Sequence, residues 1–540
     1  MRPPAVSKAL RLLLGITVLL ALTLFSPPAA AVTPQARELP VAVVEQGLLQ
    51  GSALGGAHAF LGVPYAAPPV GAWRFRAPRP ARHWAGLRQA TRQAPACRQF
   101  SPFGLADPTA VSEDCLYLDV YRPLQAHPGS RLPVILWIHG GAYTQGTGTQ
   151  FGGQTLARLT NSVVISINYR LGQLGYLDLD GLADEDRPRS GSWGLMDQIA
   201  ALSWTRDNVA AFGGDPGNIT VSGQSAGSGS VCALLASPRT SGLFSRAILQ
   251  SGPCSLLQAP SQEQARSQAE SFATAAGCPD PRTRTACLRE APAQALEAAA
   301  RNIPVAGPAY GDELLPHQPS AAITSGTWNR VPILIGTTRA EGRFFVALTQ
   351  PRLTSDQYTA QIHAQYGPAA TEVLARYPLS DYASPYLAMS ALMTDSLFAC
   401  PTVDTARAFA RQVPTYAYEF DDPDSPTLLG AQVPGLDMAN GHSAELAYVH
   451  DFTLTNTPLT PEQSQFADSM KRYWGAFARS GRPDLPGLPR WSAVGPEYEV
   501  LTLSPYGTRM SDSFASDHQC AFWERPTLPA VAAGTLPMRP

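Results

Sequence analysis

The sequence contains a five-residue stretch, Gly-Gln-Ser-Ala-Gly at residues 223–227, that is compatible with few folds. A strand-like run at residues 219–222 precedes it, and a helix-like run at residues 229–235 follows it. This is the G-x-S-x-G pattern of a nucleophile elbow, a sharp strand-to-helix turn that exposes a strained serine. Gly223 and Gly227 lack a Cβ, so the two arms of the turn can approach each other closely.

The pattern also fits a turn of small residues that carries no chemistry. The flanking strand and helix supply the context that the motif requires, and they favour Ser225 as a nucleophile. The N-terminus of the following helix would lie beside the negative charge that develops during attack. Because a serine hydroxyl is a weak nucleophile by itself, the elbow predicts an oxyanion hole, a base and an acid elsewhere in the chain.

A glycine-rich loop supplies the candidate oxyanion hole. Residues 132–138 form a continuous apolar run, typical of a strand buried on both faces, and His-Gly-Gly-Ala follows it. In this architecture the donors are the backbone N–H after the nucleophile and N–H groups of such a loop. We expect the N–H groups of Gly141, Ala142 and Ala226 to bind the oxyanion, with Gly140 shaping the loop. A plain glycine turn at a strand end is the alternative.

His442 is the candidate base. The triad order for this architecture is serine, acid, histidine, so only histidines after Ser225 qualify. His442 follows Asn440 and Gly441, a turn signal, and a histidine on a loop can reach a serine at the top of a strand. A surface histidine beside a turn is the alternative. The later histidines fit less well, because they leave little chain for an acid, lie in a helical pattern, end an apolar run or stand near the terminal cysteine: His317, His363, His450 and His518.

Glu341 is the candidate acid. It follows the buried run at residues 333–336 by a short loop. In open α/β sheets the ligands lie beyond the carboxyl ends of the strands. The carboxylate would orient the imidazole and stabilise its charged form. A solvated loop glutamate is one alternative, and three other acids remain as rivals: Asp312, Glu313 and Asp395.

Strand and helix patterns alternate along the chain and predict an α/β fold class. We expect a large, mostly parallel central sheet with helices on both faces. The predicted strands are residues 41–50, 115–122, 132–138, 162–168, 219–222, 244–249, 331–336 and 415–420. The predicted helical regions are residues 193–212, 261–300, 353–409 and 461–477. Prolines at residues 60–69 predict an ordered surface loop there, and glycines at 55–56 signal a hairpin.

The N-terminus has the pattern of a secretory signal peptide. Basic residues precede an apolar run at residues 12–25, and alanines at 29–31 offer a cleavage site. The run is too short for an ordinary membrane span, although an uncleaved anchor is the alternative. We therefore expect residues 1–31 to be a signal peptide, residues 32–540 to form one domain, and the mature protein to be secreted or periplasmic without a stable membrane anchor.

Charge and cysteine content exclude some function classes. The net charge is −2, with 40 basic and 42 acidic residues and no basic stripe, so nucleic acid is not an expected partner. Eight cysteines in an exported protein favour disulfides, and Cys278 with Cys287 would close a short loop. The sequence contains no C-x-x-C pair and no H-E-x-x-H, which disfavours zinc. We expect neither a metal nor a cofactor.

Together these motifs resemble the type B carboxylesterases, the cholinesterase-like branch of the α/β-hydrolases. The acid and base motifs of the family match at Glu341-Gly342 and at His442 with Glu445, so the resemblance selects the same triad. The other matching stretches are residues 60–69, 74–75, 113–118, 139–141, 168–172, 194–198 and 212–216.

The resemblance also implies a disulfide pattern. Two loop-closing pairs of the family, and a third pair seen in the cholinesterases, match three pairs of cysteines here: Cys97 with Cys115, Cys278 with Cys287, and Cys400 with Cys520. Cys232 and Cys254 are left over. A bridge between these two is favoured over two buried thiols.

Three differences from the family narrow the class of substrate that is expected. Gln224 stands where the family usually has glutamate, which removes a negative charge and weakens the case for a cationic substrate. The loop between Cys97 and Cys115 contains no tryptophan, whereas the choline-stacking tryptophan of the cholinesterases lies in that loop. A true cholinesterase is therefore disfavoured. Ala142 replaces the third loop glycine, and its N–H can still donate.

The resulting hypothesis is a secreted serine carboxylesterase that hydrolyses small-molecule esters through an acyl-enzyme. We expect Tyr143, Gln224, Tyr310 and Phe345 to line its pocket. The alternatives are a non-catalytic binding or adhesion module and, within enzymes, a lipase, a polyester or mycotoxin esterase, or an amidase. The acyl group, the alcohol and the oligomeric state stay open.

Overall fold

The structure is a computed structural model. It describes Met1 and residues 39–525, except for residues 100–109, 183–190, 257–258, 302, 304, 306, 429–432, 434, 453 and 456. The contacts divide the chain into two units, Met1–Leu39 and Pro40–Pro540. The predicted signal peptide lies, apart from Met1, outside the described residues, and the fold below is that of the second unit.

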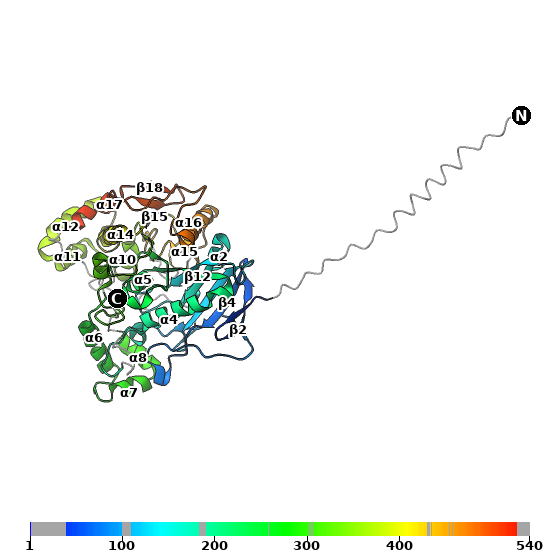
Figure 1. The fold of residues 1–540 in the computed structure, drawn as a ribbon. Helices are drawn as coiled ribbons and strands as arrows, with labels where there is room; N and C mark the ends of the chain where they lie inside the picture. The colour runs from blue at the N-terminus through cyan, green and yellow to red at the C-terminus, as the bar shows by residue number, and fades with distance from the viewer. Residues whose placement is uncertain are drawn as a thin grey trace. The chain divides into compact units, whose positions relative to one another are not determined.

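An eleven-stranded sheet runs through this unit (Figure 1). The seven neighbouring strands in the middle of the sheet pair in parallel, and antiparallel strands complete both edges. The expected α/β fold with a mostly parallel sheet is therefore confirmed. In spatial order the strands are β18 (Arg509–Ser511), β17 (Val500–Leu503), β15 (Thr415–Phe420), β14 (Ile333–Thr338), β13 (Arg246–Gln250), β12 (Gly214–Gln224), β9 (Leu132–Ile138), β11 (Val163–Ile167), β8 (Tyr117–Pro123), β4 (Ala57–Pro64) and β3 (Ser52–Leu54).

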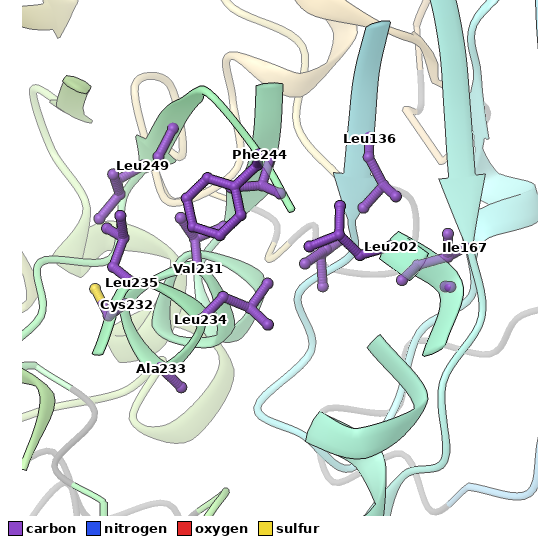
Figure 2. Packing of buried hydrophobic residues seen from close by; sticks show 14 of the residues in the cluster. Leu136, Ile167, Leu202, Val231, Cys232, Ala233, Leu234, Leu235, Phe244 and Leu249 are labelled. Atoms are coloured by element: carbon purple, nitrogen blue, oxygen red, sulfur yellow. The ribbon is translucent and has the colours of Figure 1, made fainter. Parts of the chain in front are cut away.

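Helices cover both faces of this sheet because its central strands are apolar on both sides. On one face lie α4 (Trp193–Asn208) and α5 (Ala226–Ala236). Figure 2 shows Leu235 of α5 near Leu249 of β13, and Val231 of α5 near Phe244, within the largest hydrophobic cluster. On the other face lie α2 (Gln154–Thr160) and α16 (Pro461–Ser480), which pack against side chains of the opposite strand face. The predicted helices on both faces are confirmed.

Two helical regions lie between consecutive strands of the sheet. Between β13 and β14 the chain forms α6 (Gln262–Ala275), α7 (Arg284–Glu290), α8 (Ala293–Ala300) and α9 (Pro319–Ser325). Between β14 and β15 it forms α10 (Gly342–Thr349), α11 (Ser355–Tyr366), α12 (Ala370–Arg376), α13 (Pro385–Met393), the π-helix η7 (Thr394–Ala399) and α14 (Cys400–Ala410). The region predicted as helical at residues 261–300 is three helices, because prolines at its loops cannot continue a helix.

Two predictions near the N-terminal edge are wrong in detail. Residues 60–69 are not a loop throughout, because β4 continues to Pro64 and pairs with β8. Phe60 and Val63 are fully buried in that strand, and Pro64 stands at its end, where no ladder N–H is required. Residues 41–50 are not one strand but two, β1 (Val41–Val44) and β2 (Gly47–Gln50), which pair antiparallel. The hairpin signalled by the glycines at 55–56 is confirmed between β3 and β4.

Four disulfides cross-link the unit, and they account for all eight cysteines. Three match the pairs that the resemblance implied, and the fourth joins the two cysteines that were left over: Cys97–Cys115, Cys278–Cys287, Cys400–Cys520 and Cys232–Cys254. The last bridge ties α5 to the loop after β13, close to the serine elbow. Within the described residues, every helix is too short or too polar to traverse a bilayer.

Candidate active site

Ser225 lies at the turn between β12 and α5. Its backbone has φ +56° and ψ −125°, a conformation that a residue with a side chain keeps only where its surroundings hold it. A Cβ on Gly223 would lie 2.4 Å from the carbonyl oxygen of Gly227, and a Cβ on Gly227 would lie 2.1 Å from that of Ile138. The close approach predicted for both glycines is therefore confirmed.

The loop after β9 lies against this turn. A Cβ on Gly140 would lie 3.0 Å from the Cβ of Ser225. Gly141 and Ala142 line the same cavity as Ser225. Ala226 begins α5, and the first N–H groups of a helix have no acceptor within the helix. Gly141 and Ala142 thus line the cavity of Ser225, and Ala226 follows the serine in the chain.

Glu341 lies directly after β14 and before α10, at the position predicted for the acid. Its side chain is fully buried. Oε1 accepts hydrogen bonds from the Thr337 hydroxyl at 2.6 Å and from the Thr338 N–H at 2.8 Å. Oε2 faces Nδ1 of His442 at 2.5 Å. The two threonine bonds fix the carboxylate so that its second oxygen points at the imidazole.

The loop that carries His442 turns at Asn440, as the sequence predicted. Asn440 has φ +57°, and asparagine tolerates that left-handed conformation better than most residues. Its side chain accepts a hydrogen bond from the Asp422 N–H at 2.6 Å and donates to Asp421 at 2.9 Å. These bonds hold the turn, and His442 follows two residues later on the way to α15 (Leu446–Val449).

The imidazole of His442 has a defined tautomer. Because Nδ1 faces the Glu341 carboxylate, Nδ1 carries the proton and Nε2 is the acceptor. The Gln224 amide nitrogen lies 3.1 Å from Nε2 and donates to it. Within the described residues, Nε2 bonds to this amide rather than to the Ser225 hydroxyl. The base nitrogen is thus directed toward the residue next to the nucleophile.

Two buried glutamates lie close together here and differ in their ionisation. Burial disfavours the Glu341 carboxylate, but the electrostatic interaction and hydrogen bond with His442 and the two threonine bonds outweigh it and hold the pKa of Glu341 below its usual range. Glu445 is equally buried, and burial together with the charge of Glu341 raises its pKa to about 7. Gln250 donates to Glu445 at 3.2 Å. Glu341 is therefore the carboxylate that stays ionised beside the imidazole.

Ser225 and His442 open into a cavity of about 1020 Å³, part of which is open to solvent. Its wall is mostly apolar: Phe151, Leu256, Phe344, Phe345, Phe398, Leu428, Leu446, Phe452 and Leu454. Its polar side chains, apart from the serine and histidine, are uncharged: Gln99, Gln145, Gln150, Gln224 and Ser443. Among the described residues that line it there is no Asp, Glu, Lys or Arg. The cavity suits a neutral molecule with apolar groups.

Gln224 and Phe345 line this cavity as predicted, but the two tyrosines expected beside them do not. Tyr143 has φ +60°, and this backbone directs its ring into the core, 5.3 Å from the ring of Tyr176. Tyr310 forms an isolated β-bridge with Ser261 and packs on the main hydrophobic cluster. The prediction of both tyrosines as pocket residues is wrong, because nearness in sequence does not fix the direction of a side chain.

The three rival acids and one rival histidine, His518, lie in other surroundings. Asp312 accepts two N–H groups of its own turn, and Glu313 is exposed. Asp395 lies 2.7 Å from Nδ1 of His518, whose Nε2 lies 2.9 Å from Glu419. One rival acid and one rival histidine thus form a buried cluster of their own. In the part of the chain that the structure describes, no group of three or more His, Cys, Asp and Glu is arranged to hold a metal ion.

Sequence reasoning missed most of the apolar wall. Phe398 stacks on Phe345 with ring centroids 5.5 Å apart, and the two rings lie 5.3 and 4.9 Å from the imidazole of His442. A signal existed for Phe398, because it lies two residues before Cys400 in a stretch that was used only to predict a disulfide. Gln99 carried no pattern that points to a site, because its position depends on long-range folding.

Comparison with known proteins agrees with this geometry. The model of the carboxylesterase family matches residues 38–523. Para-nitrobenzyl esterase of Bacillus subtilis (strain 168) is 34% identical over 505 residues, which cover 89% of this chain and 98% of the relative. Human cocaine esterase is 31% identical over 520 residues, which cover 90% of this chain and 91% of the relative.

Solved structures resemble the fold over the same extent. A PNB esterase structure superposes with a TM-score of 0.74 at 33% identity, covering 89% of this chain and 98% of the other. A thermophilic PNB esterase gives the same TM-score at 32% identity, covering 89% and 99%. The family model spans most of the chain, and relatives above 30% identity align over nearly their whole length. The chain therefore belongs to the type B carboxylesterase family of α/β-hydrolases and is a hydrolase of that family.

Proposed function

We propose that this protein is a secreted serine carboxylesterase that uses Ser225, Glu341 and His442 as its catalytic triad. The observation that carries the proposal is the 2.5 Å contact between Glu341 Oε2 and His442 Nδ1, in a buried pair whose imidazole opens into the same cavity as Ser225. A carboxylate on Nδ1 leaves Nε2 as the base nitrogen and stabilises the imidazolium that forms when Nε2 takes a proton.

The proposed reaction proceeds in two steps through an acyl-enzyme. The Ser225 oxygen attacks the ester carbonyl carbon while His442 Nε2 takes the hydroxyl proton. The N–H groups of Gly141, Ala142 and Ala226 donate to the oxyanion of the tetrahedral intermediate. When the ester C–O bond breaks, His442 delivers the proton to the leaving alcohol. Water, deprotonated by the same nitrogen, then attacks the acyl carbon; when the bond to the Ser225 oxygen breaks, His442 returns the proton to that oxygen and the acid is released.

The substrates we propose are neutral carboxylic esters with apolar groups. The uncharged cavity wall supports this class. Gln224 adds to the argument, because its amide donates to His442 without placing a negative charge beside the serine. That bond has to give way when the Ser225 hydroxyl donates to the same nitrogen. The names of the relatives, para-nitrobenzyl esterase and cocaine esterase, describe enzymes that act on esters.

The proposed export of the protein rests on the sequence of residues 1–31 and on the disulfides. Four bridges persist best in an oxidising compartment. N-terminal sequencing of the protein exported by its host tests this point. We expect the mature chain to begin at Val32, and a chain that keeps Met1 would contradict the cleavage.

The catalytic proposal is tested by comparing the mature protein with Ser225→Ala on a nitrophenyl ester of a short acid. We expect hydrolysis by the parent and a loss of kcat of about 10³-fold or more in the variant. Circular dichroism and thermal unfolding serve as the folding control. A folded parent without hydrolysis would favour a binding module, and a variant that keeps its activity would exclude Ser225 as the nucleophile.

A further inference from the structure

The loop that carries the proposed oxyanion donors has an unusual backbone. Positive φ angles occur at Gly141 (+107°), Ala142 (+53°), Tyr143 (+60°) and Gly146 (+110°). Two of these four residues carry side chains, and such conformations persist only where the surrounding structure holds them. The bonds that restrain this loop therefore decide where its N–H groups point.

Gln99 makes a two-sided hydrogen bond to this loop. Its Oε1 accepts the Gly146 N–H at 2.8 Å, and its Nε2 donates to the Gly146 carbonyl oxygen at 3.0 Å. The same Nε2 donates to the carbonyl oxygen of Cys97 at 3.0 Å. The carboxamide thus pairs with both backbone groups of one loop residue while bonded to its own segment. Gln99 also lines the cavity that contains Ser225.

Gly146 passes this restraint to the start of the loop. A Cβ on Gly146 would lie 2.5 Å from Nδ1 of His139 and 2.7 Å from the carbonyl oxygen of Gly140. Gly140 in turn lies against the serine, since a Cβ there would be 3.0 Å from that of Ser225. A continuous series of contacts therefore leads from Gln99 to the nucleophile through the loop that holds the donors.

The segment that carries this glutamine is anchored in two further ways. Cys97 is joined to Cys115 by a disulfide. The Asn168 side chain donates to the carbonyl oxygen of Pro95 at 3.1 Å and accepts the Gly148 N–H at 2.8 Å. Residues 95–99 are thus linked at two points, Gly146 and Gly148, to the loop between β9 and α2. Because this segment is itself fixed, the Gln99 carboxamide can restrain the loop rather than move with it.

We propose that Gln99 is a positioning residue for the oxyanion hole. Its carboxamide holds Gly146, and through it the N–H groups of Gly141 and Ala142, in the orientation that binds the oxyanion. The inference rests on the proposed function. The oxyanion exists in the transition state and the tetrahedral intermediate but not in the bound ester, so misaligned donors lower kcat and leave KM nearly unchanged.

Gln99→Met tests the proposal, because it keeps the side-chain length and removes all three hydrogen bonds. Gln93→Met is the matched control: Gln93 is an exposed glutamine whose Nε2 donates to the Thr149 carbonyl oxygen of the same loop at 3.0 Å, outside the cavity. The probes are a nitrophenyl ester and a trifluoromethyl ketone, which adds to the serine and forms an oxyanion. We expect Gln99→Met to lower kcat by about tenfold or more, with KM changed by less than about twofold.

The inhibition constant of the ketone distinguishes the positioning of oxyanion donors from a merely structural role, because a structural role would leave that constant unchanged. Its inhibition constant should rise by the same factor as kcat falls in Gln99→Met and stay at the parent value in Gln93→Met. An unchanged inhibition constant, or a loss confined to KM, would overturn the proposal. If Gln99→Met does not fold, Gln99→Glu decides by the same measurement, since it keeps an acceptor for Gly146 but loses both donated bonds. A parent without esterase activity would instead refute the proposed function itself.

Discussion

At the scale of single residues, the site depends on two buried glutamates that have opposite preferences for charge. Glu341 is held ionised by the imidazole and the threonine bonds, whereas Glu445 is held neutral by burial and by the charge of Glu341. Below neutral pH, therefore, Glu341 is the one of these two glutamates that carries a negative charge beside His442. Each glutamate leads to its own prediction.

Glu341→Gln should inactivate the enzyme without unfolding it. The amide can still occupy the space beside Nδ1 of His442, but it cannot stabilise the imidazolium. We expect kcat for ester hydrolysis to fall about 10³- to 10⁴-fold. Steady-state kinetics measure the loss, and thermal unfolding checks the fold. A variant within tenfold of the parent would show that another group supplies the acid.

Glu445 should make the protein less stable as the pH rises. Its folded pKa, about 7, lies above the unfolded value of 4.5, so the unfolded state releases this proton first. The stabilising contribution of the neutral form is complete below pH 4.5 and is lost as the pH rises through 7. Glu445→Gln removes this dependence while keeping the acceptor for Gln250.

The measurement is the melting temperature of parent and Glu445→Gln across this pH range. The parent should lose stability relative to the variant between pH 4.5 and 7. A difference that stays constant with pH would mean that Glu445 does not titrate there. The other groups that face this carboxyl are common to both proteins: Glu341, His442 and Tyr418.

The sequence predicted a catalytic serine, base and acid because each stands in a local pattern. Ser225 has its elbow, His442 follows a turn, and Glu341 follows a buried strand, and the structure brings the last two together at 2.5 Å. The pocket wall has no such local pattern. Tyr143 was misjudged because its backbone conformation sends the ring inward, and Gln99 was missed because folding brings it to Gly146 from 47 residues away.

At the scale of elements, the strand β12 and the helix α5 hold the nucleophile by close backbone contact. The carbonyl oxygen of Ile138 in β9 leaves no room for a side chain at Gly227. The apolar strand β9 was predicted to the residue from its composition, whereas β14, expected at residues 331–336, spans Ile333–Thr338. Residues 60–69 were misjudged because proline at a strand end resembles proline in a loop.

Gly227→Ala should destabilise the elbow more than a glycine-to-alanine substitution elsewhere in β12 or α5. Its Cβ would lie 2.1 Å from the Ile138 oxygen, so the helix has to shift. We expect a loss of unfolding free energy of about 1–3 kcal/mol or more, together with lost esterase activity. Gly217→Ala is the control, since its nearest neighbour is Asp215 at 3.4 Å. Equal denaturation midpoints for the two variants would contradict this account.

At the scale of the whole molecule, disulfides join parts of the fold that are distant in sequence. Cys400 and Cys520 are 120 residues apart, whereas Cys278 and Cys287 are 9 apart. The number of cysteines does not determine how eight of them pair, so the expectation for both pairs came from the family resemblance. The layered architecture was predictable for a different reason, because alternating strands and helices permit few arrangements.

Removing the long disulfide should cost more stability than removing the short one. The entropy that a bridge takes from the unfolded chain grows with the logarithm of the loop length. For these separations the double variant Cys400→Ser/Cys520→Ser should lose about 2 kcal/mol more than Cys278→Ser/Cys287→Ser. Urea unfolding under oxidising conditions measures both. A larger loss from the short bridge would show that local packing dominates over chain entropy.

Trapping the covalent enzyme would show whether Ser225 is the nucleophile of a carboxylesterase. The mature protein is treated with a fluorophosphonate and digested, and the peptides are examined by mass spectrometry. We expect one phosphonyl adduct, on the peptide that contains Ser225, and no adduct in Ser225→Ala. A folded protein that forms no adduct, or one that carries it on a different serine, would contradict the account.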